Sequence, residues 1–409
     1  MNEKNATPTR YIGLDIHKHY LVAVGVDPEG DKVLGPQRVQ LSDLESWMCK
    51  TLTPQDAIAV EMTGNTWQVH DDLLPHVHSV TVVHPPHVKL ITRARVMTDR
   101  IAALTLAKLL AKGLLVGIWV PTPEVRDLRM LIAQRAKMGK LSTQARNRLH
   151  AVLHRHHLPL PEKGSLFASE NRPWWLNLPL SSAEKVTVIS NLDSLDFANK
   201  QIGMLERTLT ELAAKDERVP LLIQLTGISI LSAMTILAAI GFIHRFPSAK
   251  HLVGYAGLGA AVHDSGQTSR TGKITKAGRK DLRATMVEAA HTAVRHDAHW
   301  KAKFEQLEPR LGYNKAIVAI ARRMLVSVWH FLSKDEANRF ADPVRVARKL
   351  MQHTYRLGKA NRPKGQSTGE YVRHLLDQFG IGRDLTHIPW GQVRKPIPLP
   401  PSSLPAPGD

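Results

Sequence analysis

The chain is poor in cysteine, in long apolar runs and in acidic residues. Cys49 is the single cysteine among 409 residues, which excludes an intrachain disulfide framework and a zinc site built from several cysteines. No apolar stretch reaches the length of a membrane span without charges, and the N-terminal MNEKNATPTR has no apolar signal segment. We therefore expect an intracellular, cytoplasmic protein with no membrane partner.

Basic residues greatly outnumber acidic ones. There are 36 Asp and Glu residues against 55 Lys and Arg, and the formal net charge is +19. So large a positive excess predicts a polyanionic partner, and nucleic acid is the first expectation. A merely soluble basic protein, or one that sits on an anionic membrane, is the alternative on charge alone.

Residues 1–120 have the pattern of an α/β domain. Short apolar runs rich in β-branched residues predict five strands, in YIGLDI, LVAVGVD, KVLGPQRVQL, DAIAVEM and SVTVVHP. Ser42 and Glu45 have the spacing of a capping box before a short helix, and Thr98 is the expected cap of a helix over residues 99–112. The order of three strands followed by alternating helices and strands predicts a ribonuclease-H-like fold.

Residues 121–218 predict a basic helical linker. Apolar residues recur at helical spacing from about 124 to 157, and a second long helical stretch covers 182–217. Two such helices could form an antiparallel coiled-coil arm, often a dimerisation device, and simple bundle packing is the alternative. The first helix carries Arg126, Arg129, Arg135, Lys137, Lys140, Arg146 and Arg148. Because few acidic residues accompany them, we expect this surface to lie along a nucleic-acid backbone.

Residues 219–334 predict a mostly helical C-terminal unit. It opens with LTGIS, where a tight turn at Gly227 resembles a helix–hairpin–helix whose backbone N–H groups can hold a phosphate; a plain helix connection is the alternative. The remaining segment, 335–409, is expected to contain one or two basic helices. Its last residues, KPIPLPPSSLPAPGD, are too rich in proline to pack, so we expect a disordered tail.

Three carboxylates stand at unusual places in the N-terminal pattern. Asp15 lies inside the first apolar strand, Glu61 closes the strand DAIAVEM, and Asp99 begins the last helix. A carboxylate buried in an apolar strand is costly unless something such as a metal ion compensates it. Hard oxygen ligands of this kind suit Mg²⁺ or Mn²⁺, and two such ions can support phosphoryl displacement. Caps or salt bridges are the alternatives, and sugar kinases and actin-like ATPases share this opening.

A serine in a basic, glycine-rich loop is the second candidate for chemistry. Ser265 precedes Gly266 in HDSGQTSRTGKITKAGRKDLR, so its hydroxyl can be exposed on a turn. The surrounding cations are Arg270, Lys273, Lys276, Arg279 and Lys280. They would stabilise the charge that develops when the hydroxyl attacks a phosphodiester. A serine that only donates a hydrogen bond to phosphate is the alternative, and Thr268 and Ser269 compete for either role.

The ordered motifs resemble those of the DEDD-type transposases of insertion sequences, a group that includes the Piv-like DNA invertases. The similar segments are YIGLDIHKHYLVAV, AVEMTGNTW, MTDRIAALTLAKLL, NRLHAVLHRH, LTGISILSAMTILAAIGFIHRFPSAKHLVGYAGL, SGQTSRTGKITKAGRKDLR and KAIVAIARRMLVSVWHFL. The resemblance implies a RuvC-type domain whose acidic tetrad binds Mg²⁺, and a C-terminal serine that forms a phosphoserine link to DNA. Asp15, Glu61 and Asp99 match the first three acidic positions, and Ser265 matches the nucleophile.

The resemblance also implies partners. These are donor and target double-stranded DNA, a structured guide RNA from the element's non-coding end, and further copies of the chain in a dimer or tetramer with composite active sites. A bacterial, nucleoid-associated location follows from the DNA substrate.

One position departs from the family pattern. The family has a second aspartate three residues after the first on the last helix, and this chain has Ala102 there, with Met97 in place of the usual lysine. Alanine cannot bind a metal. Another group must fill the gap, or the chain is a weakened or inactivated copy.

Three functions follow from these expectations. The first is a serine- and metal-dependent recombinase. The second is a metal-dependent nuclease of the Holliday-junction-resolvase type, in which water attacks and Ser265 only holds phosphate. The third is a DNA- or RNA-binding protein without catalytic activity. An actin-like kinase is a remote fourth, since no second glycine-rich phosphate loop is evident.

Overall fold

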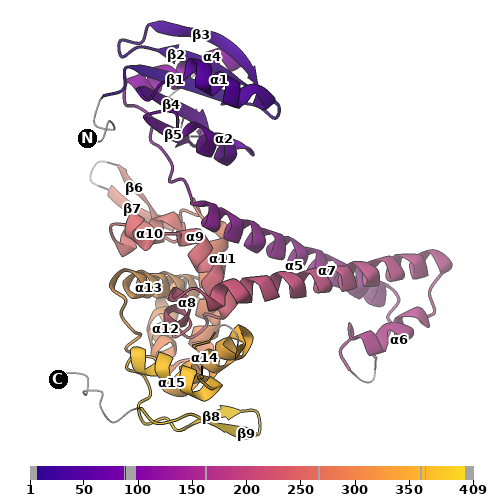
Figure 1. Cartoon of the computed structure of the whole chain (residues 1–409). Helices are drawn as coiled ribbons and strands as arrows, with labels where there is room; N and C mark the ends of the chain where they lie inside the picture. The colour runs from indigo at the N-terminus through magenta and orange to yellow at the C-terminus, as the bar shows by residue number, and fades with distance from the viewer. Residues whose placement is uncertain are drawn as a thin grey trace. The chain divides into compact units, whose positions relative to one another are not determined.

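The computed structural model describes residues 7–86, 88, 98–161, 164–265, 268–359, 362–363 and 365–400. The chain forms two compact units, Met1–Thr122 and Pro123–Asp409 (Figure 1). The first unit ends close to the predicted boundary at residue 120, and the predicted divisions after 218 and 334 stay predictions.

A five-stranded mixed sheet is the frame of the first unit. Its strands are β1 (Arg10–Ile16), β2 (Tyr20–Val26), β3 (Lys32–Gln40), β4 (Asp56–Glu61) and β5 (Ser79–Val83), in the order β3-β2-β1-β4-β5. Strands β1, β2 and β3 pair antiparallel, whereas β1, β4 and β5 pair parallel. All five predicted strands are present, and the mixed sheet is consistent with the ribonuclease-H-like expectation.

The helices of the first unit are α1 (Leu44–Thr51), α2 (Thr66–Leu73) and α4 (Asp99–Ala111). The Thr98 hydroxyl accepts a hydrogen bond from the Ile101 amide at 3.4 Å, which confirms the predicted cap. The predicted capping box at Ser42 is wrong. Ser42 lies in a short 3-10 turn, and α1 begins after Asp43 without a side-chain cap.

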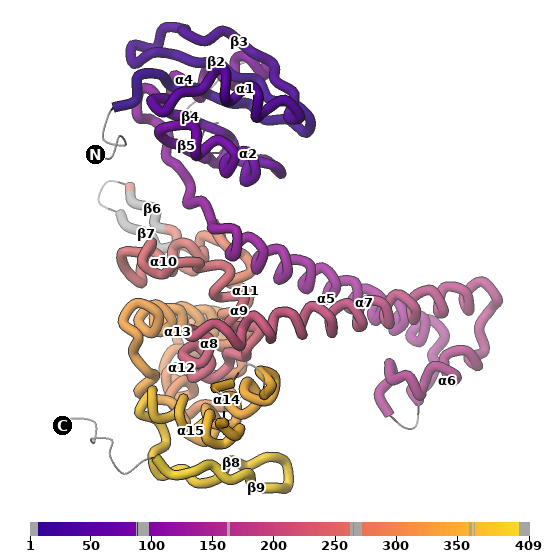
Figure 2. The backbone as a smooth tube through the Cα atoms, viewed as in Figure 1, coloured from indigo at the N-terminus to yellow at the C-terminus, as the bar shows by residue number. Residues whose placement is uncertain are grey.

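Two 33-residue helices form an arm in the second unit. Helix α5 (Pro123–Arg155) leads away from the other helices and α7 (Ser182–Ala214) returns beside it (Figure 2). They pack through buried apolar side chains, and the short helix α6 (Arg172–Leu176) adds Trp175 to this core. The predicted helix pairing is confirmed, and its use in dimerisation stays a prediction.

The rest of the second unit is mostly helical. Its elements are α8 (Arg218–Leu222), α9 (Ile230–Ile240), α10 (Ala249–Tyr255), β6 (Ala260–Ser265), β7 (Thr268–Ile274), α11 (Lys280–His296), α12 (Ala298–Leu311), α13 (Tyr313–Lys334), α14 (Pro343–Leu357), α15 (Thr368–Gln378), β8 (His387–Trp390) and β9 (Val393–Pro396). Helix α13 is long and apolar enough to cross a membrane by composition, but its apolar side chains are buried in the core of this unit.

The segment after residue 334 is part of that core. Two helices, α14 and α15, are present as expected, and Val346, Leu350, Leu376 and Ile388 are buried in the same apolar cluster as α9 and α13. Residues of the predicted basic extension therefore pack into the core of this unit, and the extension as a separate part of the chain stays a prediction. The predicted disordered tail began at Lys395, which is wrong for its first residues: 395 and 396 belong to β9, and Ile397 is buried in the core. From residue 401 onwards the predicted tail lies outside the described residues.

Candidate metal site and catalytic residues

Strand pairing places two of the predicted acids side by side. Strands β1 and β4 are parallel, and their last registered pair is Leu14 with Val60. Asp15 and Glu61 follow directly in the two strands. Because the carboxyl ends of parallel neighbours meet at one edge of the sheet, both residues lie at that edge.

A glycine brings the third acid to the same edge. Gly13 precedes the site in β1, and a Cβ there would stand 2.0 Å from the Ala103 carbonyl oxygen and 2.6 Å from the Ala107 amide nitrogen. The missing side chain therefore lets α4 pack directly against β1. Since the Thr98 cap fixes the start of α4, Asp99 in its first turn faces Asp15.

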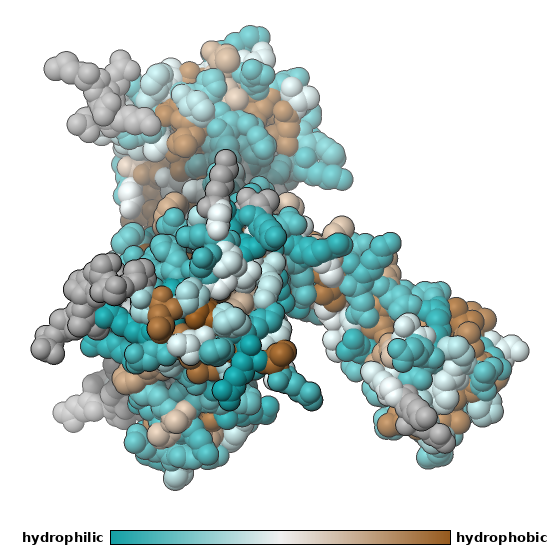
Figure 3. Space-filling view, turned by 60° about the horizontal axis from the view of Figure 1, so that its bottom comes forward, coloured by the Kyte–Doolittle hydropathy of each residue, from teal (hydrophilic) through white to brown (hydrophobic). Residues whose placement is uncertain are grey.

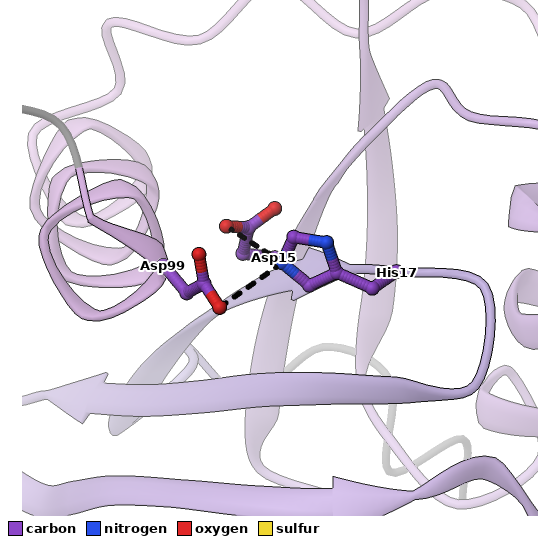
Figure 4. A group of neighbouring side chains, drawn as sticks. All are labelled: Asp15, His17 and Asp99. Carbon is purple, nitrogen blue, oxygen red and sulfur yellow. Dashed lines mark ion pairs between the residues drawn. The ribbon is translucent and has the colours of Figure 1, made fainter.

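Asp15, His17 and Asp99 form a compact cluster of ligand atoms (Figure 4). One oxygen or nitrogen atom from each lies within 4.8 Å of the others. The Nε2 atom of His17 is 3.5 Å from Asp15 Oδ2 and 3.3 Å from Asp99 Oδ2. This nitrogen is buried, and the described residues offer it no well-directed hydrogen bond.

That donor set fits a divalent cation. Two carboxylate oxygens and one imidazole nitrogen are ligands that Mn²⁺ accepts readily, and the carboxylates also suit Mg²⁺. A buried nitrogen that lacks a hydrogen-bond partner is costly unless a ligand satisfies it.

Tyr20 holds the cluster from the start of β2. Its hydroxyl donates a hydrogen bond to Asp99 Oδ2 at 3.0 Å, and its ring stacks on His17 with 4.6 Å between centroids. The Arg38 guanidinium lies 3.8 Å from the centroid of the same ring. Tyr20 therefore orients one carboxylate and one imidazole together, as outer partners of metal ligands commonly do.

The electrostatics of the cluster favour a cation. Burial raises the pKa of Asp15 above its ordinary value; His17 opposes this shift and the charge of Asp99 adds to it. The hydrogen bond to Asp99 likewise raises the pKa of Tyr20. Two carboxylates this close repel one another, so a bound cation would stabilise both in their charged form.

Glu61 and Ala102 are the other two positions of the predicted tetrad. The Glu61 side chain is half-buried at the sheet edge. Among the described residues, the ligand atoms that lie within 4.8 Å of one another belong to Asp15, His17 and Asp99, and Glu61 is not in this group. Ala102 is half-buried one turn along α4 from Asp99 and offers no ligand atom. Met97 lies outside the described residues.

Ser265 ends strand β6 in the second unit. Its side chain is exposed, and it pairs across the hairpin with Thr268 of β7. Ser269 pairs with Asp264, and Arg270 with His263. Gly266 lies outside the described residues.

Four of the five predicted cations near Ser265 have described side chains, and the side chain of Arg270 lies outside the described residues. Lys273, Lys276 and Lys280 are exposed. Arg279 donates to the Asp281 carboxylate, with 3.0 Å between Nε and Oδ1. Its guanidinium therefore has a partner inside the protein.

The predicted cations of α5 differ in their surroundings. Lys137, Lys140, Arg146 and Arg148 are exposed, and Arg126 is half-buried. Arg129 donates to the carbonyl oxygens of Ala238 and Ala239 at 2.7 and 3.1 Å, and burial lowers its pKa.

Arg135 pairs with Glu206 of α7, with 2.6 Å between Nη2 and Oε1. Arg129 and Arg135 thus join elements of the second unit, and their contact with nucleic acid stays a prediction. These interior partners are distant in the chain, and no local pattern indicates them.

Comparison with known sequences adds a family. Residues 12–158 match the DEDD transposase family of the IS110 type, and residues 219–305 match a family described as "Transposase IS116/IS110/IS902 family". Together these matches span more than half of the chain. The chain belongs to the IS110/IS116 family of transposases. It is therefore a DNA transposase or recombinase by family.

Two relatives illustrate the range of this family. The transposase for insertion sequence element IS1111A of Coxiella burnetii is 23% identical over 81% of this chain and 91% of its own length. The pilin gene-inverting protein of Moraxella bovis is 26% identical over 66% of this chain and 77% of its own length. DEDD transposases are divalent-metal dependent, which agrees with the cluster at Asp15.

Two residues of the cluster were not predicted from the sequence. His17 stands two positions after Asp15, and this spacing was its one signal. Tyr20 had no such signal, because its contact with Asp99 joins residues 79 positions apart.

Proposed function

We propose that the chain is a metal-dependent serine recombinase that moves a DNA element. The observation that carries the proposal is the cluster of Asp15, His17 and Asp99 at the edge of the ribonuclease-H-like (RuvC-type) sheet. Such a site has the donors to hold Mg²⁺ or Mn²⁺ beside a phosphodiester. Glu61, which ends β4 at the same edge as Asp15, would be a further carboxylate available to the ion.

The covalent step belongs to Ser265. Its Oγ attacks the phosphorus of a DNA strand, a phosphoserine bond forms, and the phosphorus–oxygen bond to one sugar breaks. The serine proton passes to a nearby base, and the released sugar oxygen takes up a proton. Attack by the hydroxyl of a second DNA end then reverses the step and frees the serine. The bound ion would neutralise charge on the phosphate during these steps.

His17 fills the gap left by Ala102. Its unsatisfied Nε2 lies between the two aspartates, so it can serve as the nitrogen ligand where the family pattern has an oxygen. An imidazole ligand would move the metal preference from Mg²⁺ toward Mn²⁺.

The basic surfaces support the remaining partners. The exposed cations of α5 and of the β7–α11 segment suit DNA and a structured guide RNA, and the arm suits a dimer or tetramer. In the view of Figure 3, hydrophilic residues cover most of the surface and apolar areas are small and separate. We assign the protein to the bacterial cytoplasm, at the nucleoid.

The proposal is tested by purifying the full chain with the nucleic acid it carries from cells that hold its gene and flanking DNA. We expect a defined non-coding RNA in the sequenced material, and strand cleavage when Mn²⁺ or Mg²⁺ is added. Salt-sensitive binding without cleavage in either metal would contradict the proposal and favour the inactive binding protein. If the Ala102→Asp variant then cleaved DNA, the loss of activity would be assigned to the missing carboxylate at position 102.

A further inference from the structure

A cavity of about 340 Å³ opens at the turn before α9. The turn lines it with Thr226, Gly227 and Ser229, and α14 contributes side chains from the opposite wall. Helix α14 belongs to the segment after residue 334, whose role the sequence left open. The cavity therefore joins the predicted hairpin to a part of the chain with no assigned role.

The charge of this cavity has one sign. Arg345, Lys349 and Arg356 from α14 and His296 from α11 line it. Among the described residues that line the cavity there is no aspartate or glutamate. Two acids lie just outside it: Asp297 accepts a hydrogen bond from Thr226, and Asp342 pairs with Arg345. The hydroxyl groups of Thr226 and Thr292 already donate to Asp297 and to the Glu288 carbonyl oxygen, and the Ser229 oxygen caps the Ser232 amide. Arginine side chains in a lining without acids are the features of an anion site.

The first turn of α9 adds backbone donors. The first intrahelical bond runs from the Ala233 amide to the Ser229 carbonyl at 2.8 Å, and the Ser229 side chain caps the Ser232 amide. The amide of Ile230, which lines the cavity, therefore precedes the helical ladder and has no partner within the helix. The start of the helix favours an anion at this end.

Gly227 and Lys349 fix the shape of the turn. Gly227 has φ +93°, and a Cβ there would stand 2.2 Å from the Ala289 carbonyl oxygen, so the turn is pressed against α11. Lys349 Nζ donates to the carbonyl oxygens of Ile223, Leu225 and Ile228 at 2.8–3.0 Å. Burial lowers the pKa of Lys349 to about 8; the charge of Arg345 adds to the shift and the charge of Asp297 opposes it. The positive charge of this wall therefore comes mainly from Arg345 and Arg356, and Asp342, 3.9 Å from Arg345, offsets part of it.

We propose that this cavity binds one backbone phosphate of double-stranded DNA, held between the α9 terminus and Arg345 and Arg356 of α14. The proposal deepens the proposed function, on whose DNA substrate it rests. It gives a role to the segment after residue 334, because α14 completes a phosphate site that the hairpin alone leaves open. Lys349 is a positioning residue, because all three of its donors are used by the turn.

The test measures binding of a fluorescent, random-sequence DNA duplex to the full chain, in the Ser265→Ala background and without divalent metal. We expect Arg356→Gln to weaken binding several-fold and to lower the slope of log affinity against log salt by about 1. The matched control is Arg348→Gln, an exposed arginine of α14 that does not line the cavity, which should leave the slope unchanged.

An unchanged slope in Arg356→Gln, or an equal loss in both variants, would overturn the inference. This experiment measures binding and not cleavage. A negative result would therefore not contradict the recombinase proposal, and a chain that binds DNA without cleaving it could still be tested in this way. A second experiment adds inorganic phosphate as a competitor. We expect it to displace DNA from the wild type more effectively than from the Arg356→Gln variant. Equal displacement from both proteins would mean that phosphate competes at another site, and it would count against this cavity.

Discussion

His17 is the residue on which the metal site of this chain depends most. It stacks on Tyr20, lies within 3.5 Å of both aspartates and has an unsatisfied ring nitrogen. We expect His17→Ala to weaken Mn²⁺ binding by about tenfold or more, as loss of metal-site partners commonly does. Isothermal titration of Mn²⁺ into the full chain measures the change.

A spectroscopic readout separates ligation from a merely structural role. Mn²⁺ bound to the wild type should show coupling to a nitrogen nucleus in its spin-echo spectrum, and His17→Ala should lose it. His19→Ala is the control, because that histidine is two positions away and exposed. Nitrogen coupling that survives in His17→Ala would contradict the assignment.

The acids could be predicted from the sequence at this scale and the histidine could not. Asp15 and Glu61 are anomalies within apolar strands, and Asp99 follows a capping threonine, so each stands out locally. His17 becomes a candidate ligand only because the fold places it beside Asp99 of α4, which is 82 positions away in the sequence.

At the scale of elements, the packing of α4 on β1 determines whether the cluster forms. We expect Gly13→Ala to destabilise the first unit by about 1–3 kcal/mol and to weaken Mn²⁺ binding, because the new methyl group would displace α4. Urea unfolding followed by circular dichroism measures the stability. Gly35→Ala in β3 is the control, since its Cβ would meet no described atom within 4 Å; equal effects in the two variants would contradict this explanation.

Helix α14 carries a pH-dependent element. Burial lowers the pKa of His353 to about 4, and the charge of Arg356 adds to the shift. In the unfolded chain the imidazole binds its proton near pH 6.5, so the unfolded state takes up more protons between pH 6.5 and 4. Stability should therefore fall as the pH falls through this window, by roughly 3 kcal/mol in total.

Unfolding of His353→Leu across the same window checks this expectation. The variant should lose most of the acid dependence, because it has no group to protonate. His374→Leu on α15 is the control, since His374 is exposed and should leave the dependence intact. A His353→Leu variant that keeps the wild-type slope would assign the acid sensitivity to other groups.

Local signals predicted elements well, and tertiary burial explains the errors. The Thr98 cap and the arm helices follow from neighbouring residues. Ser42 and Glu45 have the spacing of a capping box, but the chain forms a 3-10 turn there before α1 begins. The many cations of α14 and α15 led to the prediction of a basic extension. Their apolar faces are instead buried in the same core as α9.

For the whole molecule, chemistry is divided between two units. The cluster at Asp15 lies in the first unit and Ser265 in the second, so the proposed mechanism requires both to act on one phosphodiester, within one chain or between subunits. The glycine after Ser265 made it a candidate over Thr268 and Ser269, and the resemblance assigned it the role of nucleophile.

The most direct measurement is recovery of covalent protein–DNA adducts from cells that express the full chain beside its flanking DNA, with the modified residue mapped by mass spectrometry. We predict an adduct on Ser265 that is lost in Ser265→Ala and in Asp15→Asn and kept in Ser269→Ala. An adduct on another residue, or one that persists in Ser265→Ala, would contradict the proposed mechanism.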